Sequence, residues 1–263
     1  SLRILRGVRF AVRFDLTPEK ETENAMTALA PLMENLARER VFEELCQLLP
    51  LVKAADLLRY IPILSQAIPE LATTVGFQQH SPHHAYDVFT HTAYVTEAVA
   101  ADLPLRWAAL LHDVGKPAAF TADETGRGHF YGHAQLGAEL ANAILLRLKA
   151  PTELRKKVVF LIDKHMTKLE PDKKLLRRRL AQYGPEVFDQ LLLLQEADFT
   201  SKGVRGDSGP DFGAVRELLS EILREDACLS LKDLAVNGHD LMALGIRGKA
   251  LGETLNRLLE KVM

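Results

Sequence analysis

The chain has 263 residues, of which 47% are apolar and 26% charged, enough for one large or about two to three small folded units. This composition excludes an intrinsically disordered chain, and a formal net charge of -2 excludes a strong overall basic field, while a local basic patch stays open. The two cysteines, Cys46 and Cys228, form neither a disulfide nor a metal-binding pattern, which favours a cytoplasmic protein. No apolar run approaches the roughly 18 residues of a transmembrane helix, so we expect no membrane partner.

Helical periodicity dominates the N-terminal part of the chain. We expect an amphipathic helix over residues 2–14, in which an apolar face and a basic flank repeat together: Leu5, Val8, Val12 and Arg6, Arg9, Arg13. Thr17 followed by Pro18 predicts the N-cap and first turn of a second helix. Two further helical patterns cover roughly residues 36–49 and 52–60. The prolines and weak periodicity of residues 62–83 predict a linker with short helical pieces.

The rest of the chain is also helical in pattern, apart from turn-rich stretches. Residues 119–133, AFTADETGRGHFYGH, predict a small hairpin or an irregular loop. The glycine-rich residues 203–213 lack a preceding strand and the GxxxxGK[ST] order of a phosphate loop, which favours a plain linker. Long helices are expected at residues 86–100, 104–115, 133–149, 151–166, 173–182, 185–201, 214–225 and 249–262. The predicted fold class is all-α.

Histidines and aspartates recur on these expected helices and at their ends. A single histidine is more often a surface or hydrogen-bonded core residue than a metal ligand. Here, however, several helices each carry one or two such side chains next to apolar faces: His91, His112, Asp113, His133, His165 and Asp198. Imidazoles and carboxylates are costly to bury unless they are paired or bound to a cation. The combined pattern therefore predicts a metal site, whereas His112 and Asp113 alone would also fit a helix terminus.

The predicted ligand set constrains the metal and its chemistry. Two or more imidazoles with two carboxylates suit Mn, Fe, Co, Ni or Zn, with Mg at a carboxylate-rich subsite. Adjacent helical residues point about 100° apart, so His112 and Asp113 can share an ion only between helices or near a helix end. Such an ion presents hydroxide to an electrophile such as a phosphate ester. Lys116 either neutralises a phosphate oxygen or is solvated.

A set of motifs carries these residues in order: YDVFTHT, LLHDVGK, FYGHAQLGA, IDKHM and EADF. The ordered set resembles the HD superfamily of metal-dependent phosphohydrolases, although the dipeptide HD alone would carry no weight. The resemblance implies that the core metal ligands are His91, His112, Asp113 and Asp198. It also implies that His133 and His165 hold a second metal, bridged by Asp113. Of the other histidines, we expect His84 and His129 to line the site and the rest to be exposed: His80, His83 and His239.

The two ends of the chain carry a second resemblance. The segments SLRILRGVRFAVRFDL, LARERVFEELCQLL and LAVNGHDLMALGIRGKALGETLNRLLEKV resemble parts of class II tRNA nucleotidyltransferases and bacterial poly(A) polymerases. Arg3 falls on an arginine that reads the incoming nucleotide in that family, and we expect Arg6 to assist it, with a solvated basic face as the alternative. Arg40 and Glu44 have the spacing of an ion pair.

RNA contact is expected in the second half of the chain. Residues 147–179 contain twelve lysines or arginines against four aspartates or glutamates, a local excess that can engage phosphates. The C-terminal segment corresponds to a part of the family that contacts the body of tRNA. The residues expected to contact RNA are Arg177, Arg178, Arg179 and Lys249.

Together the resemblances predict four regions: a neck-like RNA- and nucleotide-binding region (1–61), a linker (62–83), an HD domain (84–201) and a C-terminal tRNA-binding-like region (204–263). The family's nucleotidyltransferase head carries a GSxxR…DxD pattern, which does not occur in this sequence. We therefore expect the C-terminal portion of a bacterial CCA-adding enzyme, without nucleotide addition of its own.

The implied activity is that of an HD-type 2',3'-cyclic phosphodiesterase and phosphatase, with His112, Asp113 and Lys116 as catalytic residues. The expected cofactors are one or two divalent ions (Mn, Ni, Mg, Fe or Co). The expected partners are tRNA and nucleotides or other phosphoesters, and a homodimer is left open. Two alternatives remain: a stand-alone HD nucleotidase, and a non-catalytic tRNA-binding module with a structural metal.

Overall fold

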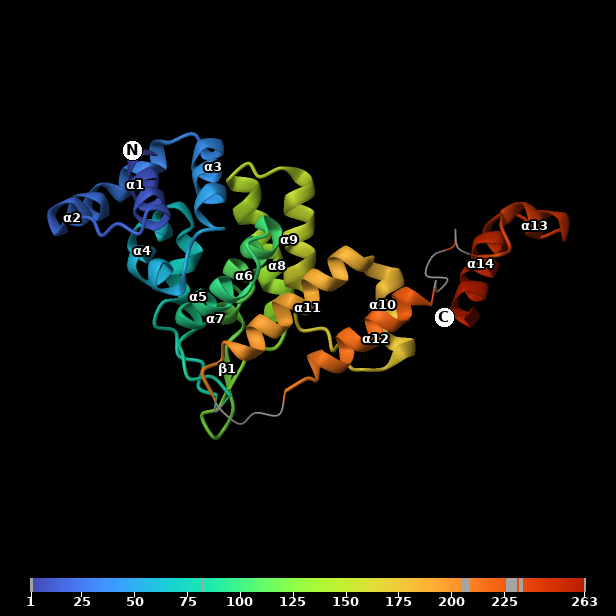
Figure 1. Cartoon of the computed structure of the whole chain (residues 1–263). Coiled ribbons are helices and arrows are strands. Elements are labelled where there is room, and N and C mark those ends of the chain that lie inside the picture. The colour runs from blue at the N-terminus through green and yellow to red at the C-terminus, as the bar shows by residue number, and fades with distance from the viewer. Residues whose placement is uncertain (1, 82, 205–208, 226–230, 232–233, 263) are drawn as a thin grey trace. The chain divides into compact units, whose positions relative to one another are not determined.

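Figure 1 shows a computed structural model of the chain, which describes residues 2–81, 83–204, 209–225, 231 and 234–262. The described part is almost entirely helical, with a single two-stranded sheet, so the all-α prediction is confirmed. No helix in it is long and apolar enough to cross a membrane. Cys228 and part of the glycine-rich stretch at 203–213 lie outside the described residues.

The α-helices are α1 (Leu2–Arg13), α2 (Lys20–Leu29), α3 (Arg38–Leu48), α4 (Ala54–Ala67), α5 (Val88–Ala98), α6 (Leu103–Leu111), α7 (Lys116–Ala119), α8 (His133–Arg147), α9 (Thr152–Lys164), α10 (Lys173–Tyr183), α11 (Pro185–Thr200), α12 (Phe212–Arg224), α13 (Gly238–Ala243) and α14 (Lys249–Val262). Short 3-10 helices η1 (Ala30–Asn35) and η2 (Pro69–Thr74) and strands β1 (Thr121–Ala122) and β2 (Gly128–His129) complete the set. The strands pair antiparallel, so residues 119–133 contain the small hairpin that the turn residues predict.

The chain divides into two compact units. The first contains Ser1–Thr167 and Leu193–Asp207, and the second contains Lys168–Leu192 and Ser208–Met263. In the second unit α10 packs against α12, where Lys173 bonds Glu221 and Glu225. In the same unit α13 packs on α14.

Several helix boundaries differ from the sequence prediction. Helix α6 ends at Leu111 and not at residue 115, and two further differences lie near the N-terminus. The second helix begins at Lys20 with Glu19 as its N-cap, not at Thr17, because the chain leaves α1 through a left-handed residue, Asp15, and a bond from Leu16 N to Ala11 O closes that end. The linker predicted from residue 62 is wrong in its first part, because Pro62 lies inside α4. Proline removes a helical hydrogen bond, and we attribute the continuation of α4 to the burial of Ile63, Leu64 and Ala67.

Helix α1 is attached to α3 by an apolar face and a buried ion pair. Ile4, Leu5 and Val8 are buried, as the periodicity of residues 2–14 predicts. Arg9 Nε donates to Glu44 Oε2 at 2.8 Å, and both side chains are about nine-tenths buried. The ion pair predicted between Arg40 and Glu44 is therefore wrong: the α3 carboxylate faces α1, whereas Arg40 is exposed.

The HD part of the first unit is built from helices α5, α6, α8 and α9, which lie side by side (Figure 1). Trp107 and Leu111 on α6 are fully buried, and the Trp107 ring stacks on Phe42 at 5.8 Å. A side chain at Gly115 would place its Cβ 2.5 Å from the His133 carbonyl oxygen, so only glycine permits this approach of the α6–α7 turn to α8. The turn that carries His112 and Asp113 is thereby pressed against the start of α8.

The buried ion pair between Arg9 and Glu44 leads to a stability prediction. We expect Glu44→Ala to lower the free energy of unfolding of the first unit by roughly 3 kcal/mol or more, because it leaves the Arg9 charge buried without a partner. Urea unfolding can be followed by the fluorescence of Trp107, the single tryptophan of the chain, which lies in the same unit. The control is Glu43→Ala, an exposed carboxylate on the same helix. Equal losses in the two variants would contradict the prediction.

Candidate metal centre

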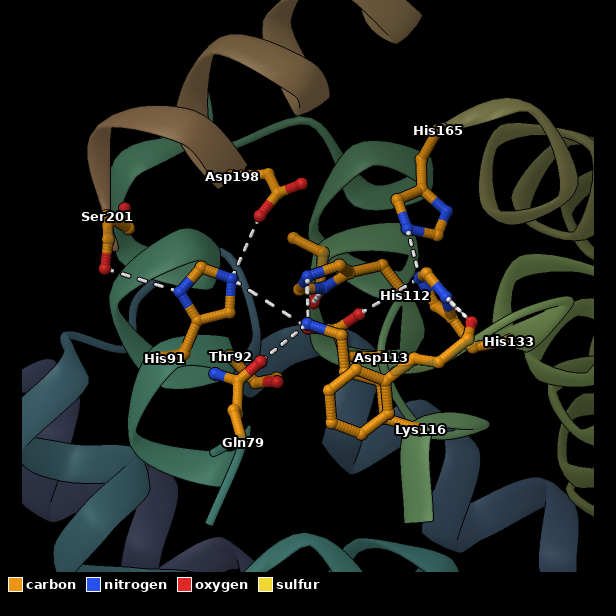
Figure 2. A network of polar contacts seen from close by, with 12 residues as sticks. Gln79, His91, Thr92, His112, Asp113, Lys116, His133, His165, Asp198 and Ser201 are labelled. Atoms are coloured by element: carbon orange, nitrogen blue, oxygen red, sulfur yellow. Dashed lines mark hydrogen bonds and ion pairs between the residues drawn. The ribbon is translucent and has the colours of Figure 1, made fainter. Parts of the chain in front are cut away.

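The predicted metal ligands come together in the first unit (Figure 2). His91 lies on α5, His112 caps the C-terminus of α6, and Asp113 follows it in the turn before α7. The remaining ligands come from three further helices: His133 begins α8, His165 caps α9, and Asp198 lies near the end of α11. Of these six side chains the four imidazoles and Asp113 are buried.

Each of the four imidazoles is oriented by a backbone carbonyl. The Nδ1 atoms of His112, His133 and His165 bond the carbonyls of Ala109, Phe130 and Ile162 at 2.8, 2.7 and 2.6 Å. His91 Nδ1 bonds the Ser201 carbonyl at 3.2 Å. A carbonyl can only accept, so Nδ1 carries a proton in all four rings and the Nε2 atoms point into the site. This is the outer-shell arrangement of metal-binding histidines.

The Asp113 carboxylate lies between two imidazole pairs. Its Oδ2 atom is 3.1 Å from His112 Nε2 and 3.8 Å from His91 Nε2. Its Oδ1 atom is 3.6 Å from His133 Nε2, which in turn is 3.3 Å from His165 Nε2. Two groups of potential ligands result, one with His91 and His112 and one with His133 and His165, and both contain Asp113. Asp198 Oδ1 approaches the first group, 2.9 Å from His91 Nε2.

These contacts leave several buried polar atoms without a hydrogen bond. His133 and His165 face each other with unprotonated Nε2 atoms, which cannot form a hydrogen bond. His112 Nε2 and both Asp113 oxygens find no hydrogen-bond partner among the described residues. Buried polar atoms of this kind need an additional partner, and the donor set of imidazole nitrogens and carboxylate oxygens fits a divalent cation.

The protonation states also suit a cation. Burial would raise the pKa of Asp113, but the charges of His112 and Lys116 keep it well below its ordinary value, so the group is a carboxylate. Burial lowers the pKa of His165 to about 4 and that of His84 to about 3, and it lowers the pKa of His133 as well. At neutral pH these three rings are uncharged, so a metal need not displace protons from them.

Lys116 is buried, so the solvated alternative for this residue is wrong. Its Nζ atom donates to Gln79 Oε1 at 2.8 Å. The same atom lies 2.7 Å from Asp113 Oδ2 as an ion pair without hydrogen-bond alignment. A fixed positive charge therefore stands beside the Asp113 carboxylate.

A cleft of about 270 Å³ opens onto this centre. The side chains that line it include His84 and His129, as the sequence predicts, and several that it did not single out: Ser81, Tyr131, Met166 and Lys202. The exposed positions of His80, His83 and His239 also agree with the prediction. The sequence analysis did not single out Gln79, because an isolated glutamine in a stretch bounded by prolines forms no recognisable motif.

The basic residues predicted to bind nucleotide or RNA do not line this cleft. Arg3 and Arg6 are exposed on α1, with Arg6 Nε 3.8 Å from Glu44 Oε1. In the second unit Arg177 bonds Glu225 at 2.6 Å and Arg179 bonds the Tyr183 hydroxyl at 3.1 Å. Arg178 and Lys249 are exposed, and Lys249 lies 3.6 Å from Glu253.

Comparison with known proteins identifies the family. Residues 88–202 match the HD domain, and residues 15–74 match the family described as "Probable RNA and SrmB- binding site of polymerase A". The chain is 35% identical to a CC-adding tRNA nucleotidyltransferase of Thermus thermophilus and 37% identical to an A-adding tRNA nucleotidyltransferase of Deinococcus radiodurans, each over 98% of its length.

The chain contains an HD domain and is homologous to tRNA nucleotidyltransferases over 98% of its length. It spans a little under two thirds of these two relatives, 62% and 63%. It is also 34% identical to a "Multifunctional CCA protein" of Azoarcus, over 77% of this chain and 52% of the relative. The matches confirm both resemblances seen in the sequence, and the HD centre described above lies in the region that tRNA nucleotidyltransferase relatives share.

The neutral state of His165 leads to a pH prediction for the metal-free protein. In the folded protein this ring gains a proton only near pH 4, whereas in the unfolded chain it does so near its ordinary value of about 6.5. The unfolded chain therefore binds more protons between these values. The contribution of the neutral His165 ring to the free energy of unfolding is fully present above about pH 6.5. As the pH falls from 6.5 to 4, the free energy of unfolding decreases by up to about 1.4 kcal/mol per pH unit.

Urea unfolding at several pH values, followed by Trp107 fluorescence, measures this dependence. His165→Asn is expected to reduce the slope between about pH 6.5 and 4, with a remainder from the other buried rings. The exposed histidine variant His80→Asn is expected to keep the wild-type slope. An unchanged slope in His165→Asn would contradict the prediction.

Proposed function

We propose that this chain is a metal-dependent phosphohydrolase that cleaves phosphate esters of nucleotides and RNA ends, including 2',3'-cyclic phosphates. The observation that carries the proposal is the position of Asp113 between two pairs of imidazole Nε2 atoms. The match of residues 88–202 to the HD domain supports it.

In this proposal His91, His112, Asp113 and Asp198 hold one divalent ion, and Asp113, His133 and His165 hold a second. Nitrogen-rich ligands favour Mn, Fe, Co or Ni over Mg. Bound ions supply Lewis-acid polarisation of a phosphoryl oxygen and lower the pKa of water.

The side chains of the cleft have their own tasks in the reaction. Lys116 offsets negative charge on a phosphate oxygen, because its ammonium is held at the centre by Gln79. The carbonyls behind the histidines hold the four rings with Nε2 facing the site, so the rings need no reorientation to bind the ions.

A second proposed function is the binding of tRNA. The relatives are named for their action on tRNA, and residues 15–74 match an RNA-binding family. In the second unit a cavity of about 780 Å³ is lined by Leu175 and by more basic than acidic side chains: Lys174, Arg178, Arg257 and Lys261 against Glu170 and Asp172. We propose that this surface binds phosphates of the RNA, while Arg3 and Arg6 on α1 stay predicted nucleotide contacts. Nucleotide addition is not proposed for these residues.

The hydrolytic proposal is tested by turnover of 2',3'-cAMP and bis-p-nitrophenyl phosphate with Mn²⁺ or Ni²⁺. We expect the double variant His112→Ala, Asp113→Ala to lose activity by about 10³-fold or more, since it removes ligands of both proposed ions. Its metal content, measured by elemental analysis, is expected to fall with its activity.

The chain offers a matched control for this variant. His239 and Asp240 form a second His–Asp dipeptide, exposed at the start of α13 in the other unit. The variant His239→Ala, Asp240→Ala is expected to keep the wild-type turnover. Equal rates in wild type and the His112, Asp113 variant would exclude the hydrolytic function, and retained metal without turnover would favour a structural ion.

The RNA-binding proposal predicts a loss of salt-dependent affinity. Lys174→Gln, Arg178→Gln is expected to weaken tRNA binding and to reduce the slope of log affinity against log salt by about 2, one for each phosphate contact. The control is Lys174→Arg, Arg178→Lys, which keeps both positive charges at the same positions and is expected to keep the wild-type slope. Filter binding at several salt concentrations measures both, and equal slopes in the two variants would contradict the prediction.

A further inference from the structure

Two aromatic rings form a flat, exposed surface at the rim of the cleft. The rings of His129 and Tyr131 are stacked with their centroids 5.4 Å apart and an angle of 4° between their planes. Both residues line the cleft of the metal centre, and Tyr131 is 80% exposed. A large aromatic side chain this exposed offers most of one ring face to solvent.

The stack lies where strand β2 ends and the chain turns towards α8. His129 is the last residue of β2, and Tyr131 is in the turn before α8, which a bond from His133 N to the Phe130 carbonyl closes. Phe130, between them, points the other way, where it contacts the Phe120 ring at 5.6 Å and lies 5.5 Å from Lys116 Nζ. The segment therefore carries one ring towards the floor of the cleft and two rings at its rim.

The hairpin that carries the stack is held by several bonds. The Asp123 carboxylate accepts from Thr125 N at 2.9 Å, from Arg127 N at 3.0 Å and from His129 Nε2 at 2.8 Å. Gly128 N donates to the His80 carbonyl at 2.9 Å, and a Cβ at Gly128 would lie 2.4 Å from the Gln79 carbonyl oxygen. The backbone before the stack is thus pressed onto the segment whose Gln79 side chain holds Lys116.

The size of the cleft bears on its ligand. A volume of about 270 Å³ lies below the usual range of roughly 300 to 1,000 Å³ for pockets that enclose a whole small molecule. A phosphate at the metal centre would leave the rest of a nucleotide to the rim. Nucleobases stack on aromatic rings with little regard to their identity.

We propose that Tyr131, backed by His129, is a stacking platform for the nucleobase of the substrate. The platform makes the centre selective for nucleoside phosphates and RNA ends over base-free phosphate esters, and tolerant of which base is present. This inference rests on the proposed hydrolytic function and adds to it the feature of the substrate that is recognised.

The test compares AMP with ribose 5-phosphate, which has the same phosphate and sugar but no base. We expect Tyr131→Ala to lower kcat/KM for AMP by roughly 5- to 100-fold, mainly through KM, and to leave ribose 5-phosphate unchanged. Tyr131→Phe retains the ring and is expected to behave like wild type. The control is Phe14→Ala, an exposed aromatic that stacks on Phe10 in α1 and does not line the cleft.

Calorimetric titration of the same two compounds, in Mn²⁺, separates this inference from the proposed function. If wild type hydrolyses neither these compounds nor 2',3'-cAMP, the hydrolytic function fails, and a loss of AMP binding confined to Tyr131→Ala still supports the platform. An unchanged preference for AMP in Tyr131→Ala would overturn the inference. A loss that is equal for both compounds would also overturn it, because it indicates a structural role for Tyr131.

Discussion

The buried carboxylate of Asp113 is the group on which the organisation of the first unit depends. An ionised carboxylate away from water is strongly destabilising unless opposite charge or bound cations compensate it. Here its two oxygens face two different pairs of imidazoles, and the Lys116 ammonium stands beside one of them. Helices α5, α6, α8 and α9 can pack closely around such a group only because their polar side chains converge on it.

Backbone contacts give this centre its geometry. The imidazole rings are fixed from behind by carbonyls at or near the ends of helices, where such groups lack partners within the helix. Gly115 allows the turn after α6 to touch the first residue of α8, so that Asp113 and His133 meet. The candidate metal ligands converge at helix ends because the helices leave backbone carbonyls free there to orient them.

The two proposed functions of the chain depend on different kinds of physical interaction. The HD centre relies on buried, fully oriented groups in a low-dielectric environment, where electrostatic interactions are strong. The basic surface of the second unit relies on exposed charges such as Arg178 and Arg257, whose attraction for phosphate is screened by salt. At the rim of the cleft, Tyr131 and His129 add a third kind of interaction, the apolar and dispersive contact of stacked rings.

Most of the architecture and the ligand set could be predicted from the sequence. Helical periodicity is a local property, so the all-α class and most helix positions follow from it, and the ordered motifs singled out His91, His112, Asp113, His133, His165 and Asp198. Boundaries at Thr17 and Pro62 were missed, because the closing bond of α1 and the burial of Ile63 and Leu64 override local preference.

The sequence by itself determined the kinds of helices and the chemical types of the ligands, since both depend on residue identity and short spacing. Only the tertiary structure decided which Asp113 oxygen faces which imidazole pair, that Glu44 pairs with Arg9, and that Tyr131 lies at the rim beside His129. The physical reason is that hydrogen bonds and charge contacts act over a few ångströms in space. Their partners are chosen by the packing of distant segments and not by distance along the chain.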